Sequence, residues 1–226
     1  MFDKLDATIY RDSGAFYTNN FEVLLSKITD CYLLMKLQEL ILENDENKIR
    51  DVLLLRYLKN DEVRKQLQLL HWHFEREVPE DYSVGRTDIK VVSLNTFKKQ
   101  EDYYIVECKR LDNVNTTGAT GLNAKYVQNG ISRFTEKYYS SYRRVNAMIG
   151  FVVEKMNIHL NTKKINKLLK TFAASTTIKY ITKDNFIEKF EYQYHSTHSD
   201  SDGEKLKIYH LMFEFSENIS THQIVN

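Results

Sequence analysis

Two segments decide the fold of this chain: Gly-Arg-Thr-Asp-Ile-Lys-Val-Val at residues 85–92 and Tyr-Tyr-Ile-Val-Glu-Cys-Lys-Arg at residues 103–110. Both are rich in β-branched and aromatic residues, which favour extended strands. We therefore expect strands over residues 84–93 and 102–109, joined by a hairpin around residues 98–101.

Three charged residues interrupt these strand patterns. Asp88 lies inside the first strand, where aspartate is disfavoured. Glu107 and Lys109 are two residues apart at the end of the second strand, and side chains at that spacing point to the same face of a sheet. If the two strands pair, Asp88 comes to lie next to Glu107 and Lys109.

Two carboxylates that converge beside a lysine form a pocket of hard oxygen donors. Such a pocket suits Mg²⁺ or Mn²⁺, and the main-chain carbonyl of Cys108 is placed to be a further ligand. Lys109 would then orient or deprotonate a water, or stabilise negative charge on a phosphate. The alternative is structural, with Asp88, Glu107 and Lys109 forming a surface ion pair across the two strands.

The motif formed by Asp88, Glu107 and Lys109 resembles the PD-(D/E)XK, or restriction-endonuclease-like, nuclease family. Glu107-Cys108-Lys109 follows Asp88 after nineteen residues, within Gly-Arg-Thr-Asp-Ile and Val-Glu-Cys-Lys-Arg. The resemblance covers about residues 44–153, and Thr87 stands where the family name has proline. It implies that Asp88 and Glu107 bind divalent metal and that Lys109 assists the water. The fold it implies is α/β, with a mixed central sheet flanked by helices.

Two further parts of the sequence resemble the family. Many members carry an acidic residue on the helix before the core strands, and Glu46 is the candidate here, with Glu43 as the alternative. Glu46 has a structural explanation too, because a glutamate in the first turn favours the helix dipole. The helix after the Glu-x-Lys strand often supplies polar residues to the site. Gln128 and Lys125 lie three residues apart there and would face a phosphate together, unless they are simply exposed helix residues.

The rest of the sequence predicts one domain. Apolar residues recur at helical spacing over 21–42, and Asn44-Asp45 and Asn60-Asp61 are suited to cap two shorter helices. A strand over 72–78, a polar loop over 112–121, a helix over about 122–139, a strand over 147–153 and a helix over 158–172 are expected next. Strands over 177–181, 190–195 and 205–215 follow, with a loop at 196–203. We expect a single nuclease-like domain over 1–226, with a helical arm at 1–43, a catalytic core at 44–153, and C-terminal strands and a helix at 154–226.

The charge of the chain is uneven although its net value is only +1. Residues 109–144 carry seven basic and two acidic side chains, a net charge of +5, whereas residues 1–62 carry a net −4. A basic segment on a neutral protein fits a polyanion-binding face. The alternative is a solvated helix surface. The candidates for contact with nucleic acid are Lys125, Tyr126, Arg133, Arg143 and Arg144.

The cysteine and histidine patterns weigh against other chemistries. Two cysteines, Cys31 and Cys108, cannot build a disulfide framework or a four-cysteine zinc site. His195 and His198 have no cysteine or third histidine nearby, so zinc is not expected. The first residues are polar, and no apolar run approaches the ~20 residues of a membrane span. We therefore expect a cytoplasmic protein without membrane attachment.

Together these features predict a metal-dependent phosphodiesterase. We expect a DNA endonuclease that uses Mg²⁺ or Mn²⁺ held by Asp88, Glu107, the Cys108 carbonyl and Glu46. The Lys/Asn/Ile-rich composition is typical of bacteria, where restriction or phage defence would be its setting. One alternative is a non-catalytic module that keeps the fold and binds nucleic acid or protein, with the long first helix available for a homodimer or a protein partner. Another is an enzyme of the same fold that acts on RNA or on branched DNA.

Overall fold

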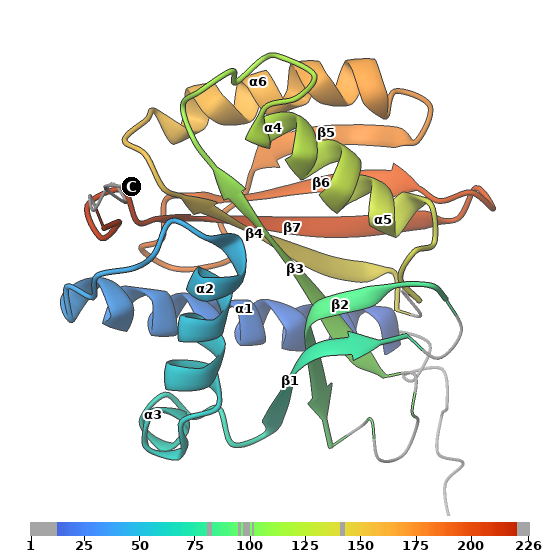
Figure 1. Cartoon of the computed structure of the whole chain (residues 1–226). Helices are drawn as coiled ribbons and strands as arrows, with labels where there is room; N and C mark the ends of the chain where they lie inside the picture. Colours follow the sequence, from blue (N-terminus) through green and yellow to red (C-terminus); the bar gives the residue numbers. More distant parts are fainter. Residues whose placement is uncertain are drawn as a thin grey trace, which may run out of the picture.

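The computed structural model describes residues 13–80, 83–94, 96, 100, 102–140 and 143–220, with side chains from residue 16 onward. Within these residues the chain places helices on both faces of one seven-stranded sheet (Figure 1). The expected α/β architecture, with a mixed central sheet flanked by helices, is therefore confirmed. None of the described helices has both the length and the apolar character needed to cross a bilayer.

The sheet combines antiparallel and parallel pairing in the order β1-β2-β3-β4-β7-β6-β5. The first three strands form an antiparallel meander, β4 lies parallel to both β3 and β7, and β6 is antiparallel to both of its neighbours. The pairing of β2 with β3 is the one predicted, while most of the expected turn at 98–101 lies outside the described residues. The strands are β1 (Trp72–Pro79), β2 (Arg86–Ser93), β3 (Tyr103–Leu111), β4 (Val145–Val152), β5 (Thr177–Lys183), β6 (Gln193–Ser199) and β7 (Lys205–Glu214).

Helices contribute to a core on each face of the sheet. α1 (Ser13–Leu37) shares one core with η2 (Val52–Leu58), a π-helical segment that continues α2 (Glu46–Asp51). The other core contains α4 (Leu122–Tyr126), η3 (Val127–Ile131), α5 (Ser132–Thr135) and α6 (Ile158–Phe172). α3 (Asp61–Gln66) precedes β1. The side chains of Asp45 and Asn60 cap α2 and α3, as the sequence predicts.

The apolar stripe of α1 belongs to the chain's own core. Phe21 stacks on Tyr104 with ring centroids 4.5 Å apart, and Tyr32 stacks on Phe213 at 4.3 Å. Burying this stripe supplies a large part of the hydrophobic stabilisation on that face of the sheet. The expectation that this apolar face is available to a partner is therefore wrong, and α1 is not a projecting arm.

α1 also ends earlier than its apolar pattern suggests. The helix stops at Leu37, and Glu39 adopts a left-handed backbone conformation with φ of 48°. Leu42 is buried because the chain beyond the helix runs beside Ile219, with which it forms a parallel bridge. Leu42, which is buried but lies after the end of the helix, therefore fits the helical spacing of the apolar residues only by coincidence.

The helix expected over 122–139 is shorter and irregular. It ends at Thr135, and Lys137 then adopts a left-handed conformation with φ of 56°. The chain after α5 passes against the start of β2, where a Cβ atom on Gly85 would lie 1.9 Å from the carbonyl oxygen of Tyr138. Glycine at position 85 therefore permits a close backbone approach that no other residue allows.

β6 covers part of the segment expected to be a loop at 196–203. Ser196 and His198 are completely buried, and the Ser196 hydroxyl oxygen lies 2.8 Å from Nε2 of both His198 and His210. Because each buried polar group has a partner, the strand continues through polar residues to Ser199. His210 is a packed core histidine.

Candidate active site

The residues of the motif meet where β2 and β3 stop pairing. The paired residues run from Val92 with Tyr103 to Ile89 with Val106. Beyond that point the Asp88 carboxylate accepts the N–H of Cys108 at 2.7 Å, in place of a main-chain acceptor. This hydrogen bond holds Asp88 against β3.

Lys109 is the centre of the site. Its ammonium nitrogen lies 2.6 Å from Glu107 Oε1, 3.2 Å from Glu46 Oε1 and 4.0 Å from Asp88 Oδ2. It also donates to the main-chain carbonyl of Cys108 at 2.8 Å. We call these five residues the Lys109 cluster. The structure thus brings together the residues that the sequence singled out from β2, β3 and the preceding helix.

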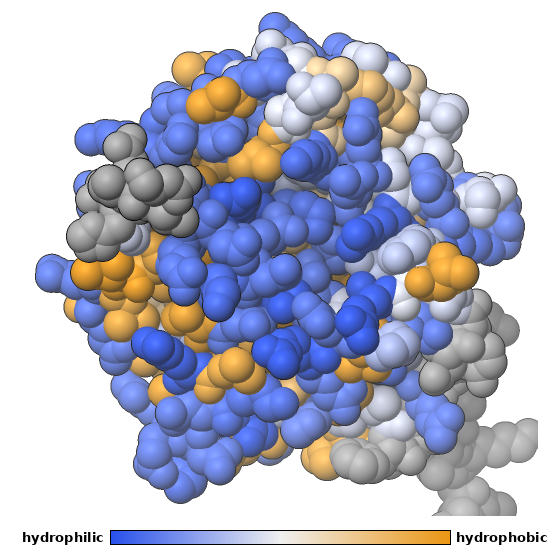
Figure 2. Space-filling view, in the orientation of Figure 1, coloured by the Kyte–Doolittle hydropathy of each residue, from blue (hydrophilic) through white to orange (hydrophobic). Residues whose placement is uncertain are grey.

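α2 supplies the third carboxylate of the cluster. Asp45 caps this helix with its side chain and so fixes Glu46 at its first position. One oxygen of Glu46 accepts the N–H of Arg110 at 2.8 Å, and the other faces Lys109. The alternative candidate, Glu43, is exposed and lines a separate surface hollow. The geometry therefore favours Glu46. In the space-filling view the middle of this face, between α2 and α5, is hydrophilic (Figure 2).

Glu107 is completely buried, and both of its carboxylate oxygens have donors. Tyr139 donates to Oε2 at 2.5 Å, and Arg133 joins Lys109 at Oε1, at 2.7 Å. Burial is the main cause that raises the pKa of Glu107 to about 7, and the Asp88 carboxylate adds to it against the opposing effect of Lys109 and Arg133. Removal from water, more than repulsion between carboxylates, therefore sets the proton affinity of Glu107.

The pKa of Lys109 is shifted in the direction that keeps its ammonium group charged. Burial alone would lower its pKa, but attraction to the carboxylates of Glu107, Asp88 and Glu46 outweighs burial and raises the pKa above its ordinary value. The cluster therefore holds a positive charge firmly among its carboxylates.

A second buried cation, missed in the sequence, holds Asp88 from the side of α2. The Arg50 side chain is only 3% exposed, and its guanidinium lies 3.3 Å from Asp88 Oδ1. Asp51 and Glu77 accept from the same guanidinium, each at 2.9 Å. Arg50 follows Glu46 by four residues, and that spacing places both on one helix face. The spacing of four residues between Glu46 and Arg50 is the feature of the sequence from which the position of Arg50 in the site could have been predicted.

Tyr139 and Arg133 were not predicted as partners of Glu107. Arg133 was expected to contact nucleic acid, and its guanidinium also donates a hydrogen bond to Glu107. Tyr139 lies beyond the end of α5, in a segment whose position depends on the β1–β2 turn around Gly85. Local sequence patterns carry no signal for a contact made in this way.

The donors around Lys109 suit a hard divalent cation. Carboxylate oxygens and a main-chain carbonyl are the ligands that Mg²⁺ prefers, and here they already surround a positive charge. Within the residues that the structure describes, no group of three or more His, Cys, Asp or Glu side chains is arranged to hold a metal ion. The chemistry of the donor set fits Mg²⁺ or Mn²⁺, while the ammonium group of Lys109 balances the same carboxylates in the present geometry.

Three residues of the helix after β3 were expected to face nucleic acid or phosphate. Lys125 and Gln128 are exposed, and in the described part of the chain neither forms a hydrogen bond to the motif residues. Tyr126 is completely buried, with its hydroxyl oxygen 2.8 Å from His210 Nδ1. The expectation that Tyr126 contacts nucleic acid is therefore wrong, because its side chain belongs to the core.

Arg143 and Arg144 have partners within the chain. Arg143 forms an ion pair with Asp102 at 2.5 Å, and Arg144 forms one with Asp200 at 2.8 Å. Asp102 and Asp200 both lie outside residues 109–144, for which the charge was counted, so the net charge of +5 overstates the free positive charge on this surface.

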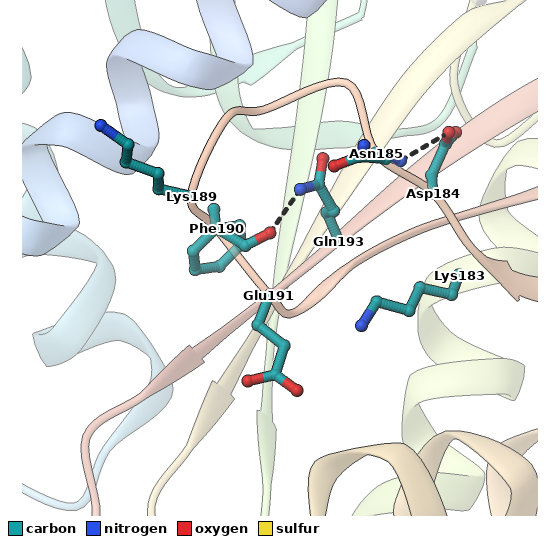
Figure 3. A pocket seen from close by; sticks show the side chains of 7 residues that line it. All are labelled: Lys183, Asp184, Asn185, Lys189, Phe190, Glu191 and Gln193. Atoms are coloured by element: carbon teal, nitrogen blue, oxygen red, sulfur yellow. Dashed lines mark hydrogen bonds between the residues drawn. The ribbon is translucent and has the colours of Figure 1, made fainter.

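A hollow of about 720 Å³ at the β5–β6 connection shares no residue with the Lys109 cluster (Figure 3). The amide group of Gln193 holds the connecting loop together by donating to the carbonyl of Phe190 and accepting the N–H of Ile187. The adjoining histidines do not share a site, because His195 pairs with Asp184 whereas His198 bonds to Ser196 on the opposite face of β6. The residues lining the hollow are Lys183, Asp184, Asn185, Lys189, Phe190, Glu191 and Gln193.

Comparison of the chain with known protein families, with curated proteins and with solved structures gives no match. Function has to be inferred from the geometry and chemistry of the Lys109 cluster.

Proposed function

We propose that this chain is a divalent-metal-dependent nuclease with a restriction-endonuclease-like fold, and that it hydrolyses phosphodiester bonds in DNA. One observation carries the proposal: three carboxylates, from Asp88, Glu107 and Glu46, lie within 4.0 Å of Lys109 Nζ. A main-chain carbonyl completes this oxygen-rich environment. Metal-assisted phosphoryl transfer needs hard oxygen ligands beside a positive donor, and this cluster offers both.

The strand order supports the fold assignment. β2 and β3 are adjacent antiparallel strands, and β4 returns parallel to β3 after the helical connection through α4, η3 and α5. Asp88 and Glu107 therefore stand on neighbouring strands of the sheet, and the helix that precedes the meander brings Glu46 to the same point. This arrangement is what the PD-(D/E)XK resemblance leads one to expect.

The residues of the cluster have distinct roles in the proposal. Asp88, Glu107 and the Cys108 carbonyl would hold Mg²⁺ or Mn²⁺, with Glu46 beside them. Such an ion, when bound, polarises a phosphate and acidifies a water. Lys109 would donate to the attacking water or to a phosphate oxygen, and so orient the first or offset charge on the second. Arg50 holds Asp88 in place through its hydrogen bond.

A second candidate is a non-catalytic module that keeps this fold and binds nucleic acid or protein. The observation that favours it is the saturation of Glu107 by Lys109, Arg133 and Tyr139, which leaves the cluster as a balanced ion-pair network. On this alternative the chain would bind DNA equally well with and without divalent cations, and it would cut none.

A plasmid assay separates the two candidates. Purified protein is incubated with supercoiled DNA in Mg²⁺ or Mn²⁺, with EDTA in a parallel reaction. We expect cleavage that EDTA abolishes and that Asp88→Asn abolishes as well, whereas Asp30→Asn, a change on α1 outside the cluster, leaves it intact. DNA binding without cleavage in every cation would favour the module. A positive result would agree with a role in restriction or phage defence in the bacterial cytoplasm.

A further inference from the structure

The hydroxyl of Tyr139 is tied to the buried carboxylate of Glu107. It donates to Glu107 Oε2 at 2.5 Å and accepts from the Arg133 guanidinium at 2.9 Å. The same guanidinium nitrogen donates to Glu107 Oε1 at 2.7 Å. Tyr139, Arg133 and Glu107 thus form a closed triangle of hydrogen bonds, and rotation of the Glu107 carboxylate would break more than one of them.

The ring of Tyr139 is held as firmly as its hydroxyl. The side chain is 1% exposed and packs against Phe134, with ring centroids 5.2 Å apart. On its other side the ring meets Gly85, where a Cβ atom would lie 2.8 Å from the ring carbon Cδ1. Gly85 stands directly before β2, three residues from Asp88. Tyr139 therefore cannot shift without disturbing the strand that carries the first acidic residue of the motif.

We propose that Tyr139 is a positioning residue for the metal site: its hydroxyl, together with Arg133, fixes Glu107 in the orientation that directs Oε1 toward Lys109 Nζ. Tyr139 then has a role beyond packing, and this role rests on the proposed function. Hydrogen bonds of this kind orient a ligating carboxylate before the cation arrives, and their loss typically lowers metal affinity by about 10–100-fold.

The neighbouring tyrosine provides a matched control. Tyr138 also lies beside Arg133, with the guanidinium 5.1 Å from its ring centroid. Its hydroxyl forms no hydrogen bond with the residues that the structure describes, so Tyr138→Phe removes an oxygen from the same segment without touching Glu107. Tyr139→Phe keeps the ring between Phe134 and Gly85 and removes only the hydroxyl, with its bonds to Glu107, to the Arg133 guanidinium and to the main-chain carbonyl of Arg86.

The experiment measures Mn²⁺ binding alone, by the electron paramagnetic resonance signal of free Mn²⁺, with no nucleic acid present. We expect Tyr139→Phe to bind Mn²⁺ at least about tenfold more weakly than wild type and Tyr138→Phe to match wild type. Arg133→Lys, which keeps the charge but loses the planar fork, should also weaken binding and serves if Tyr139→Phe fails to fold. Circular dichroism checks that each variant is folded.

The outcomes separate this inference from the proposed function. If wild type binds Mn²⁺ and both Tyr139→Phe and Arg133→Lys bind it equally well, Tyr139 only packs and the inference is overturned, while the metal site stands. If wild type itself binds no Mn²⁺, the proposed function is overturned and the inference falls with it. A loss in Tyr138→Phe as large as that in Tyr139→Phe would also overturn the inference, because the effect would then belong to the segment and not to the hydroxyl.

Discussion

Lys109 Nζ lies 2.6 Å from Glu107 Oε1, and the two residues stand side by side on one face of β3 with almost no exposure to water. A buried pair of this kind adds little net stability, because the cost of removing both charges from water offsets their attraction. Replacing such a pair by apolar residues is often neutral or stabilising, so folding alone gives little reason for a charged cluster in the middle of this sheet. The proposed metal-dependent chemistry would give a reason for these buried charges.

Divalent cations should stabilise the folded chain. An ion that binds the native cluster but not the unfolded chain raises the free energy of unfolding by mass action. We expect millimolar Mn²⁺ to raise the melting temperature of wild type and to leave that of Asp88→Asn unchanged. A thermal melt with and without Mn²⁺ measures this, and Ca²⁺ provides a comparison for a cation that prefers a larger site. A wild-type melt that does not respond to Mn²⁺ would contradict a preformed site.

The central strands and the motif could be predicted from the sequence because their signals are local. Period-two alternation placed Glu107 and Lys109 on one face, and strand pairing brought Asp88 to them. Glu46 needed the family resemblance in addition, since its position at a helix start is equally well explained by the helix dipole. The caps at Asp45 and Asn60 were also readable from single residues.

The partners of the motif could not be predicted in the same way. Arg50 and Arg133 were visible as charged helix residues, but their partners depend on how α2 and α5 dock beside the sheet. Tyr126 looked like a surface aromatic among basic residues, and only its depth in the core, beside His210, shows otherwise. Tyr139 depends on a chain reversal after α5 and on the absence of a side chain at Gly85.

Gly85→Ala should destabilise the fold more than an ordinary glycine substitution. The new Cβ would meet the Tyr138 carbonyl oxygen at 1.9 Å, and backbone cannot move aside as cheaply as a side-chain tip. We expect a loss of about 1–3 kcal/mol in the free energy of unfolding, measured by urea denaturation. Gly203→Ala is the control, since nothing lies within 4 Å of its Cβ position and only its φ of +82° opposes the change, at about 1 kcal/mol. Equal losses at both positions would show that the close approach at Gly85 is unimportant.

Lys125 and Arg143 should affect DNA binding differently. Lys125 is exposed and free to contact phosphate, so Lys125→Ala should lower the slope of log affinity against log salt by about 0.9. Arg143 is engaged with Asp102, so Arg143→Ala should leave the slope unchanged and instead lower stability by about 1 kcal/mol. Fluorescence anisotropy with labelled duplex DNA in EDTA measures the slopes. A larger change in slope for Arg143→Ala than for Lys125→Ala would reverse this assignment.

The buried histidines of the C-terminal strands should make the fold sensitive to acid. Burial lowers the pKa of His198 to about 4, from about 6.5 in the unfolded chain, and it also lowers the pKa of His210. Between pH 6.5 and pH 4 the unfolded chain therefore binds more protons, so stability falls as the pH falls. The raised pKa of Glu107 acts in the opposite sense, because a group that binds its proton more tightly when folded stabilises the fold as the pH falls below 7.

A comparison of variants isolates the contribution of His198. We expect His198→Asn to flatten the dependence of the urea midpoint on pH between 6.5 and 4, although the variant is less stable than wild type at pH 7 because it loses the bond to Ser196. His73 is exposed on β1, and His73→Gln should keep the wild-type slope. A slope in His198→Asn as steep as in wild type would assign the acid sensitivity to other groups.

Replacing Lys109 should separate binding from chemistry. Lys109→Met keeps the length of the buried side chain, and Glu107 retains its hydrogen bonds from Arg133 and Tyr139, so the variant should fold. It should bind Mn²⁺ at least as tightly as wild type, because the ammonium group no longer balances the same carboxylates. Its rate of DNA cleavage should nevertheless fall by ~10²-fold or more, the usual scale for losing a positioned proton-transfer or charge-stabilising group.

Two further variants assign the role of the lysine. Glu107→Ala should lose Mn²⁺ affinity and cleavage together, since it removes a proposed ligand. Lys109→Arg should restore cleavage only if the role is to offset charge, because a guanidinium does not release its proton near neutral pH. Single-turnover cleavage rates at saturating Mn²⁺ make the comparison. If Lys109→Met cuts DNA as fast as wild type, Lys109 takes no part in the chemical step, and the cluster has to be explained without a catalytic lysine.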